Sequence, residues 1–135
     1  MFDHLGIYTA GDLRAQAEFY EAILEPLGCR QLQTHIDPGG GGRVVFGSGV
    51  EHAPFFVLAK GKPAHWRAEQ QNGLSAIHLA FRAPSQAAVD QFHAIGVLRG
   101  ARDNGEPGPR QRGWYGAYLI DEDNNGIEAG LYLPR

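Results

Sequence analysis

Two short segments of this chain place a histidine and a leucine at the start of an apolar stretch. The first is His4-Leu5-Gly6-Ile7, and the second is His78-Leu79-Ala80-Phe81. A carboxylate, Glu128, lies in a further apolar stretch near the end of the chain. Imidazole nitrogens and carboxylates are common protein ligands of divalent transition metals. Two histidines at equivalent places in two halves therefore indicate a metal site to which both halves contribute.

Strand periodicity predicts which face of its strand each of these three side chains occupies. Successive side chains of a strand point to opposite sides, so His78 and Arg82 share the face opposite the apolar residues between them. Glu128 likewise lies opposite its apolar neighbours in the last strand. We therefore expect His4, His78 and Glu128 to point away from the core beneath the helices. If Glu128 is buried, it must be paired, bound to a metal or protonated, because an isolated buried charge is costly.

The elements that carry these residues follow the same order in both halves. Asp12 and Ser85 are good N-caps, and each precedes a helical pattern of apolar residues. The first half predicts a strand, a helix and three strands at Phe2–Thr9, Leu13–Leu27, Cys29–His35, Val44–Phe46 and Phe55–Ala59. The second half predicts the same order at Ala76–Ala83, Ser85–Gly96, Leu98–Arg102, Trp114–Ile120 and Ile127–Leu133, with a Gly- and Pro-rich loop over Asp103–Gly113.

The repeated order predicts an internal duplication within one domain that covers residues 1–135. Residue pairs such as 4 and 78, 19 and 92, and 56 and 128 keep a nearly constant offset. The first module spans about residues 1–60, a polar connector follows over 61–73, and the second module spans about 74–135. We predict an α+β fold of two βαβββ modules, in which mixed sheets curl into an open barrel-like cavity with helices outside.

Composition excludes several classes of function. The 135 residues contain 12 Lys and Arg against 15 Asp and Glu, for a formal net charge of −3. This balance provides no broad basic field for a nucleic acid or an anionic membrane. Cys29 is the single cysteine, so no internal disulfide can form, and no apolar stretch is long enough to span a bilayer. Because no signal-like segment follows Met1, we expect a cytoplasmic protein.

The twofold plan and several motifs resemble the vicinal oxygen chelate superfamily, which includes glyoxalase I, extradiol dioxygenases and the fosfomycin and bleomycin resistance proteins. The similarity covers nearly the whole chain. It rests on His4 to Ile7, the helix with Glu18-Phe19-Tyr20, the phrase His78 to Ser85, Arg102 to Gly105, and Asp121 to Glu128. The resemblance implies that His4, His78 and Glu128 bind one divalent ion per site, either Zn, Fe, Mn or Ni. It also implies a homodimer and a proton-transferring role for Glu128.

The chain departs from glyoxalase I at the fourth ligand. The position that we pair with Glu128 in the first module is Phe56, or Leu58 if the register slips by two, and neither side chain binds a metal. Glu51 and His52 could supply a ligand only if the fourth strand begins earlier. Two histidines and one carboxylate leave open coordination positions, as in facial-triad iron centres. The ligand set therefore resembles that of the dioxygenases more closely.

Four further residues are candidates for substrate binding: Arg82, Phe56, Tyr8 and Tyr118. Arg82 could recognise an anionic substrate or be a solvated strand end, and aromatic residues in strands usually belong to the core. Two functions remain open. One is a metal-dependent enzyme that chelates vicinal oxygens of a small substrate, with lyase, isomerase or dioxygenase chemistry. The other is a metal-free small-molecule or antibiotic-binding protein of the bleomycin resistance type.

Overall fold

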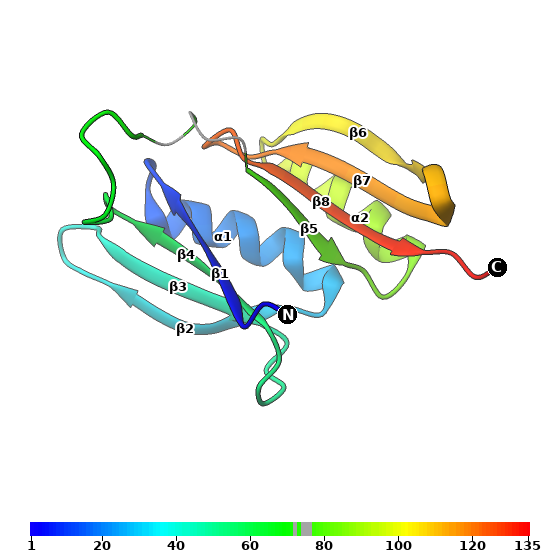
Figure 1. The fold of residues 1–135 in the computed structure, drawn as a ribbon, viewed down its shortest axis with the longest axis horizontal. Coiled ribbons are helices and arrows are strands. Elements are labelled where there is room, and N and C mark those ends of the chain that lie inside the picture. Colours follow the sequence, from blue (N-terminus) through cyan, green and yellow to red (C-terminus); the bar gives the residue numbers. More distant parts are fainter. Residues whose placement is uncertain (72, 74–76) are drawn as a thin grey trace.

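A computed structural model describes residues 1–71, 73 and 77–135. Each half consists of a strand, a helix and three strands (Figure 1). The first half contains β1 (His4–Thr9), α1 (Leu13–Leu24), a short 3-10 helix (Glu25–Leu27), β2 (Arg30–Ile36), β3 (Gly42–Gly47) and β4 (Phe55–Lys60). The second half contains β5 (His78–Arg82), α2 (Gln86–Leu98), β6 (Arg102–Pro109), a 3-10 turn (Gln111–Gly113), β7 (Trp114–Ile120) and β8 (Gly126–Tyr132). The predicted α+β class and the duplicated βαβββ order are confirmed.

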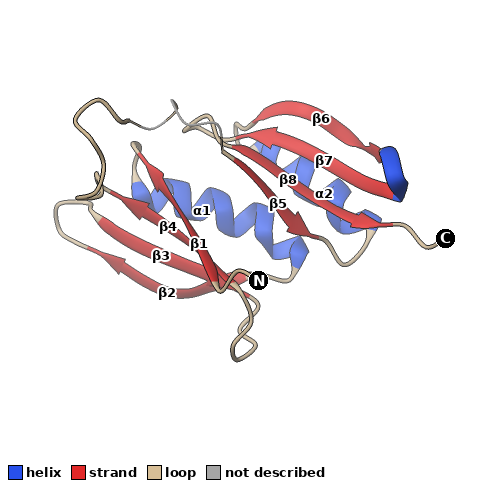
Figure 2. Ribbon diagram, viewed as in Figure 1, coloured by secondary structure: helices blue, strands red, loops and turns tan. Residues whose placement is uncertain are grey.

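The strands form two four-stranded sheets with equivalent topology. Their orders are β1-β4-β3-β2 and β5-β8-β7-β6. In each sheet the first and last strands of the module pair in parallel, and the other pairs are antiparallel. The sheets curl but do not close into a barrel, and β1 and β5 are the edge strands that face each other across the middle of the molecule (Figure 1). Both helices lie behind the sheets, so each sheet keeps one open face (Figure 2).

A side-chain cap at one end and a glycine beyond the other explain where helix α1 begins and ends. The Asp12 side chain accepts a hydrogen bond from the Ala15 backbone N–H at 2.8 Å and so satisfies one free donor of the first turn. Beyond the 3-10 turn, Gly28 has a φ of 83°, a conformation that a side chain disfavours. The buried side chains recur at helical spacing and form the core beneath the first sheet: Leu13, Gln16, Ala17, Phe19, Tyr20, Ile23 and Leu24. None of the described helices is long and apolar enough to cross a membrane.

Helix α2 starts at the predicted cap but ends later than predicted. The Ala88 backbone N–H donates to Ser85 Oγ at 3.1 Å. Gly96, which we expected to end the helix, lies inside it, and the strand predicted from Leu98 is wrong because Leu98 is still helical. A Cβ on Gly96 would collide with the side chain of Leu119, which is fully buried. Gly96 therefore serves close packing of the helix on β7.

The predicted Gly- and Pro-rich loop over Asp103–Gly113 is mostly a strand, β6. This strand forms the outer edge of the second sheet, where a proline can point its missing N–H away from the ladder. Its pairing with β7 shifts register near Gly105 and again before Gly108. This strand can contain glycine and proline because it lies at the edge of the sheet and has bulges. The predicted strand start at Ala76 lies outside the described residues.

The turn Asp121–Asn125, which we call the acidic turn, joins the two modules through buried hydrogen bonds. Tyr20 Oη on α1 donates to Asp121 Oδ2 at 2.5 Å. Asp123 accepts from the Ala10 backbone N–H at 2.8 Å and from Gln16 Nε2 at 3.3 Å. Both carboxylates are buried, at 4% and 7% exposure. A turn of the second module is thereby fixed to the end of β1 and to α1 of the first.

We predict that Tyr20→Phe lowers the free energy of unfolding by about 1–3 kcal/mol, because Asp121 loses a buried donor. Urea denaturation measures the change. Burial and the nearby Asp121 raise the pKa of Tyr20 well above its ordinary value of 10.0. A raised folded-state pKa gives stability that is complete below the unfolded pKa and is lost as pH rises above it. Stability should therefore fall above about pH 10, and less steeply in the variant.

Tyr132→Phe is the matched control, because this tyrosine is 60% exposed and should lose less than about 0.5 kcal/mol. Equal stability loss in the two variants would contradict a special role for the Tyr20 hydrogen bond.

Candidate functional site

His78 and Glu128 meet on the open face of the second sheet. The parallel pairing of β5 with β8 places Ala80 opposite Glu128, so His78 and Glu128 lie on the same face. His78 Nε2 is 2.8 Å from Glu128 Oε2. The Glu128 side chain is 9% exposed, whereas the His78 side chain is 59% exposed. The pair therefore combines a buried carboxylate with an imidazole that solvent and ligands can reach.

Trp114 holds the other oxygen of the carboxylate. Its indole Nε1–H donates to Glu128 Oε1 at 2.5 Å. The ring can lie across the sheet because Gly116 and Gly130, which are cross-strand partners, offer no side chains beneath it. A Cβ on either glycine would collide with the indole. The two glycines thus leave space for the indole ring that orients Glu128.

Two arginines flank this arrangement through aromatic rings. The Arg82 guanidinium carbon lies 5.7 Å from the Trp114 ring centroid and 5.5 Å from that of Tyr132. On the other side, Arg110 lies 5.2 Å from the Tyr118 centroid. Tyr118 in turn lies 6.4 Å from the His78 ring. Each member of the His78–Glu128 pair is therefore one aromatic ring away from a cation.

His4 lies on β1, apart from this pair. Its Nδ1 is 2.7 Å from Asp3 Oδ1, and its ring stacks on Phe55 with centroids 4.8 Å apart. The side chain is 56% exposed. Within the described residues, no group of three His, Cys, Asp or Glu side chains could hold a metal ion. One copy of the chain therefore does not bring His4 together with His78 and Glu128.

An apolar cavity of about 420 Å³ lies between β1 and β5 and separates the two histidines. His4 and His78 contribute to its wall. The remaining lining is mostly apolar: Phe2, Leu5, Leu24, Phe46, Phe55, Phe56, Leu79 and Phe81, with Cys29. Burial raises the pKa of the Cys29 thiol, which disfavours its reactive thiolate form. The cavity suits an apolar group better than a charged one.

Solved structures of other proteins share this fold over nearly the whole chain. A glyoxalase/bleomycin resistance protein from Albidiferax ferrireducens is 29% identical, with a TM-score of 0.72 over 96% of this chain and 97% of that one. A glyoxalase/bleomycin resistance protein/dioxygenase family enzyme from Burkholderia phytofirmans is 18% identical, with a TM-score of 0.66 over 97% and 98%. The fosfomycin resistance protein FosX from Mesorhizobium loti is 17% identical, with a TM-score of 0.61 over 98% and 92%. No protein-family model matches the chain, and no curated protein sequence matches it significantly.

The resemblance to the vicinal oxygen chelate superfamily is confirmed. The structural neighbours include glyoxalase, bleomycin resistance and dioxygenase family proteins. The structure also has the duplicated βαβββ order that the sequence motifs predict. The two neighbours below 20% identity support the fold alone.

The counterpart of Glu128 in the first module is neither of the residues that we predicted. Glu128 pairs with the residue two positions after His78, and Gly6, two positions after His4, pairs with Val57. Phe56 instead faces the core, where its ring contacts those of Tyr20, Phe46 and Phe81. Valine cannot bind a metal either, so the first module still supplies no carboxylate from this strand.

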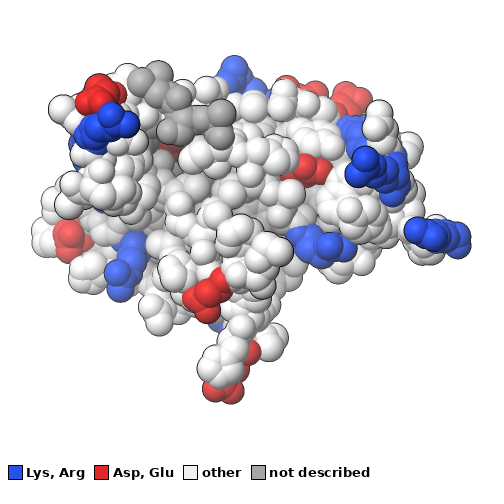
Figure 3. All heavy atoms as spheres, viewed as in Figure 1, with Lys and Arg blue, Asp and Glu red and all other residues white. Residues whose placement is uncertain are grey.

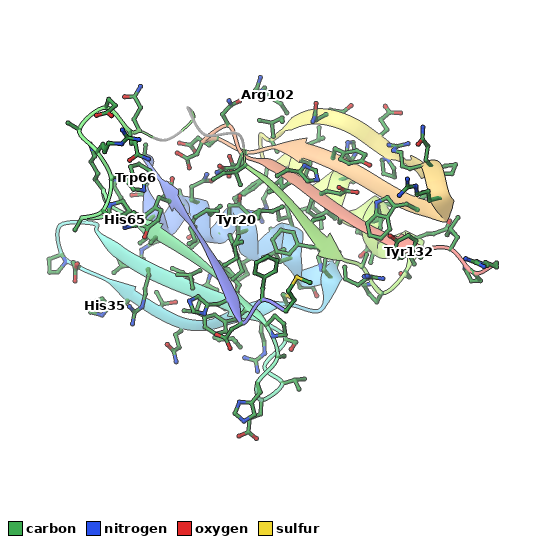
Figure 4. All side chains as sticks on the ribbon, viewed as in Figure 1. Tyr20, His35, His65, Trp66, Arg102 and Tyr132 are labelled. Atoms are coloured by element: carbon green, nitrogen blue, oxygen red, sulfur yellow. The ribbon has the colours of Figure 1, made fainter. Side chains whose placement is uncertain are left out.

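The other predicted site residues are distributed over different places. Tyr118 and Arg82 flank the His78–Glu128 pair, whereas Phe56 lies in the core and in the wall of the apolar cavity. Tyr8, near the end of β1, makes an edge contact with Trp66 of the connector, which is labelled in Figure 4. β4 begins at Phe55, so Glu51 and His52 lie in the preceding turn, where they pair with each other at 3.4 Å.

Sequence reasoning placed neither Trp114 nor Arg110 at the metal site. A signal for Trp114 was present, because Trp114, Gly116 and Tyr118 alternate along a predicted strand and must share one face. Once Tyr118 is placed opposite Glu128, that face is the open one. Arg110 lay in a segment predicted to be a loop, and its position depends on the bulged pairing of β6.

The residues present fit a divalent ion at two of the three expected ligands. His78 Nε2 and Glu128 Oε2 converge at 2.8 Å, close to the separation of about 3 Å between neighbouring ligands of an octahedral ion with bonds near 2.1 Å. Their chemistry, imidazole and carboxylate, suits Zn, Fe, Mn or Ni. His4 has the same donor type, and its contact with Asp3 is made by Nδ1 and not by Nε2. Among the described residues, β5 and β8 bring no third His, Cys, Asp or Glu side chain to this pair.

We predict that Gly130→Ala displaces the Trp114 indole from Glu128 and costs about 1–3 kcal/mol of stability through overpacking. In a Trp66→Phe background, Trp114 is the single tryptophan, and its emission spectrum measures the displacement. Gly39→Ala is the control, because a Cβ there meets no atom within 4 Å. An unchanged emission spectrum in Gly130→Ala would show that the ring does not need this space.

Proposed function

We propose that this chain is a divalent-metal-dependent enzyme that chelates adjacent oxygens of a small substrate at the His78–Glu128 pair. The observation that carries the proposal is the convergence of His78 Nε2 and a buried Glu128 oxygen, 2.8 Å apart, on an open sheet face. Lyase, isomerase and dioxygenase chemistry are all compatible with this ligand set. The family likeness supports the proposal, since the neighbours include glyoxalase and dioxygenase family proteins.

The side chains around the pair have distinct tasks in this proposal. A bound divalent ion supplies Lewis-acid polarisation of the substrate oxygens. Trp114 Nε1–H fixes one oxygen of Glu128 and thereby orients the carboxylate. Glu128 is the candidate for proton transfer, because it is the carboxylate on this face that adjoins His78. Tyr118 lies beside His78, with the ring centroids 6.4 Å apart, and contributes an aromatic wall next to the imidazole.

We propose that the third ligand is His4 of a second copy in a homodimer. Within one copy, β1 and β5 lie on either side of the apolar cavity, and no three-ligand group forms among the described residues. The open face of the second sheet is available to another molecule (Figure 2). His4 is oriented for such a role, because Asp3 holds Nδ1 and Phe55 supports the ring. A twofold dimer would give two equivalent sites.

The second candidate function is a metal-free binder of small apolar molecules. Two observations favour it. Both Glu128 oxygens already have hydrogen-bond partners, so the carboxylate is satisfied without an ion. The cavity between β1 and β5 also has a volume of about 420 Å³ and an apolar wall, within the range of small-molecule sites.

We predict that Mn²⁺, Zn²⁺, Fe²⁺ or Ni²⁺ raises the melting temperature and that EDTA reverses the change. A metal that binds only the folded state at 100 times its Kd stabilises by about 2.7 kcal/mol. His78→Ala should abolish the shift, whereas His52→Ala should retain it, because His52 is 90% exposed in a turn. A melting curve that ignores both metal and EDTA, together with a shift on adding an aromatic antibiotic, would favour the binder.

We predict that His4→Ala and Glu128→Gln each abolish metal binding alone and restore it when mixed. In a mixed dimer, one site combines His4 from one chain with His78 and Glu128 from the other, so half of its sites are intact. Random reassociation should recover about a quarter of the parental binding capacity. Titration with Mn²⁺ measures this capacity. Failure to recover any binding in verified mixed dimers would place the ligands within one chain.

A further inference from the structure

We propose that Arg82 is the anion-recognition residue of this site and that the substrate is a small organic oxyanion, a carboxylate or a phosphonate. Its reacting end lies at the His78–Glu128 pair, and its anionic group lies at the guanidinium. The inference deepens the proposed function and rests on it. It follows from the positions of the Arg82 guanidinium and the Glu128 carboxylate, which both contact Trp114 but do not pair with each other.

Arg82 has a defined position but no anionic partner among the described residues. It shares the face of His78 on β5, and its guanidinium carbon lies within 6 Å of both the Trp114 and Tyr132 ring centroids, at 5.7 and 5.5 Å. The rings hold the cation through cation–π contacts and restrict the side chain. Such contacts do not use the planar fork of N–H donors, which matches carboxylate and phosphonate oxygens.

Trp114 contacts both this cation and the Glu128 carboxylate. The indole contacts Arg82 with its ring and donates its single N–H to Glu128. Glu128 consequently has a neutral donor and an imidazole as partners, and no ion pair joins Arg82 to any described carboxylate. Arg82 therefore presents an uncompensated positive charge one aromatic ring away from the His78–Glu128 pair.

The surroundings strengthen the positive field at this end of the sheet. Arg110 lies over Tyr118, held by its bonds to the carbonyls of Glu106 and Pro109, and Arg112 follows in the same turn. An open depression of about 460 Å³ is lined by Arg110, Arg112, Trp114, Tyr118, Glu128 and Tyr132. Arg82 lies beside this depression, against the rings of Trp114 and Tyr132. Lys and Arg spheres gather over this end of the molecule in Figure 3. A protein with a net charge of −3 thus concentrates cations where a ligand would enter.

Binding of benzoate and phenylphosphonate, with neutral benzamide as the matched probe, tests the inference. The Trp66→Phe protein leaves Trp114 as the single tryptophan, and its fluorescence reports binding beside Arg82. We expect at least one anion to bind more tightly than benzamide. Arg82→Gln should weaken that anion roughly tenfold or more, because charge-assisted hydrogen bonds are lost. Arg82→Lys should lie between the two, since it keeps the charge without the fork.

Arg67→Gln is the control, because it removes the same charge from the connector at a side chain that is 82% exposed. Equal binding of benzoate, phenylphosphonate and benzamide would overturn the inference, and so would unchanged anion binding in Arg82→Gln. A Mn²⁺ titration of the same variants separates the two proposals. If His78→Ala binds Mn²⁺ like the parent while anion binding still depends on Arg82, the metal proposal fails and the anion site stands. If Mn²⁺ binding depends on His78 but the affinity for the anions does not depend on Arg82, only the inference about the substrate fails.

Discussion

The acidic turn between β7 and β8 is the constraint on which the position of the site depends. Asp121 and Asp123 are buried, and their hydrogen bonds reach α1 and the end of β1 in the other module. β8 begins directly after this turn, and the Gly126 backbone N–H donates to the Ile77 carbonyl just before β5. Glu128 follows two residues later. The contact that joins the modules therefore also sets the register that brings Glu128 to His78.

Much of this arrangement could be predicted from local sequence rules. Alternation along a strand requires only the residues of that strand, so the common face of His78 and Glu128 followed from parity. The helix starts at Asp12 and Ser85 followed from side-chain caps. The duplicated order of elements followed from repeated periodicity. These features depend on neighbours within a few residues, which is the range that a sequence pattern describes well.

The features that sequence reasoning missed depend on packing between elements. Gly96 continues a helix because Leu119 of another strand occupies the space of a side chain. The β6 segment is a strand because it lies at an edge, which its own Gly and Pro content does not reveal. The register that opposes Val57, rather than Phe56, to Gly6 is set by pairing. The distance of His4 from the pair likewise depends on how two modules pack, and no pattern within either module contains that information.

The glycine pair Gly116–Gly130 has a consequence for how this protein can change over time. Glycines directly opposite each other weaken a sheet, because neither provides a cross-strand side-chain contact. The Trp114 indole covers both and supplies the missing packing, while its N–H serves Glu128. Loss of the tryptophan would expose a weak point in the sheet as well as release the carboxylate. Selection for a folded protein alone would then preserve the orientation of Glu128, even in a lineage where the original substrate had disappeared.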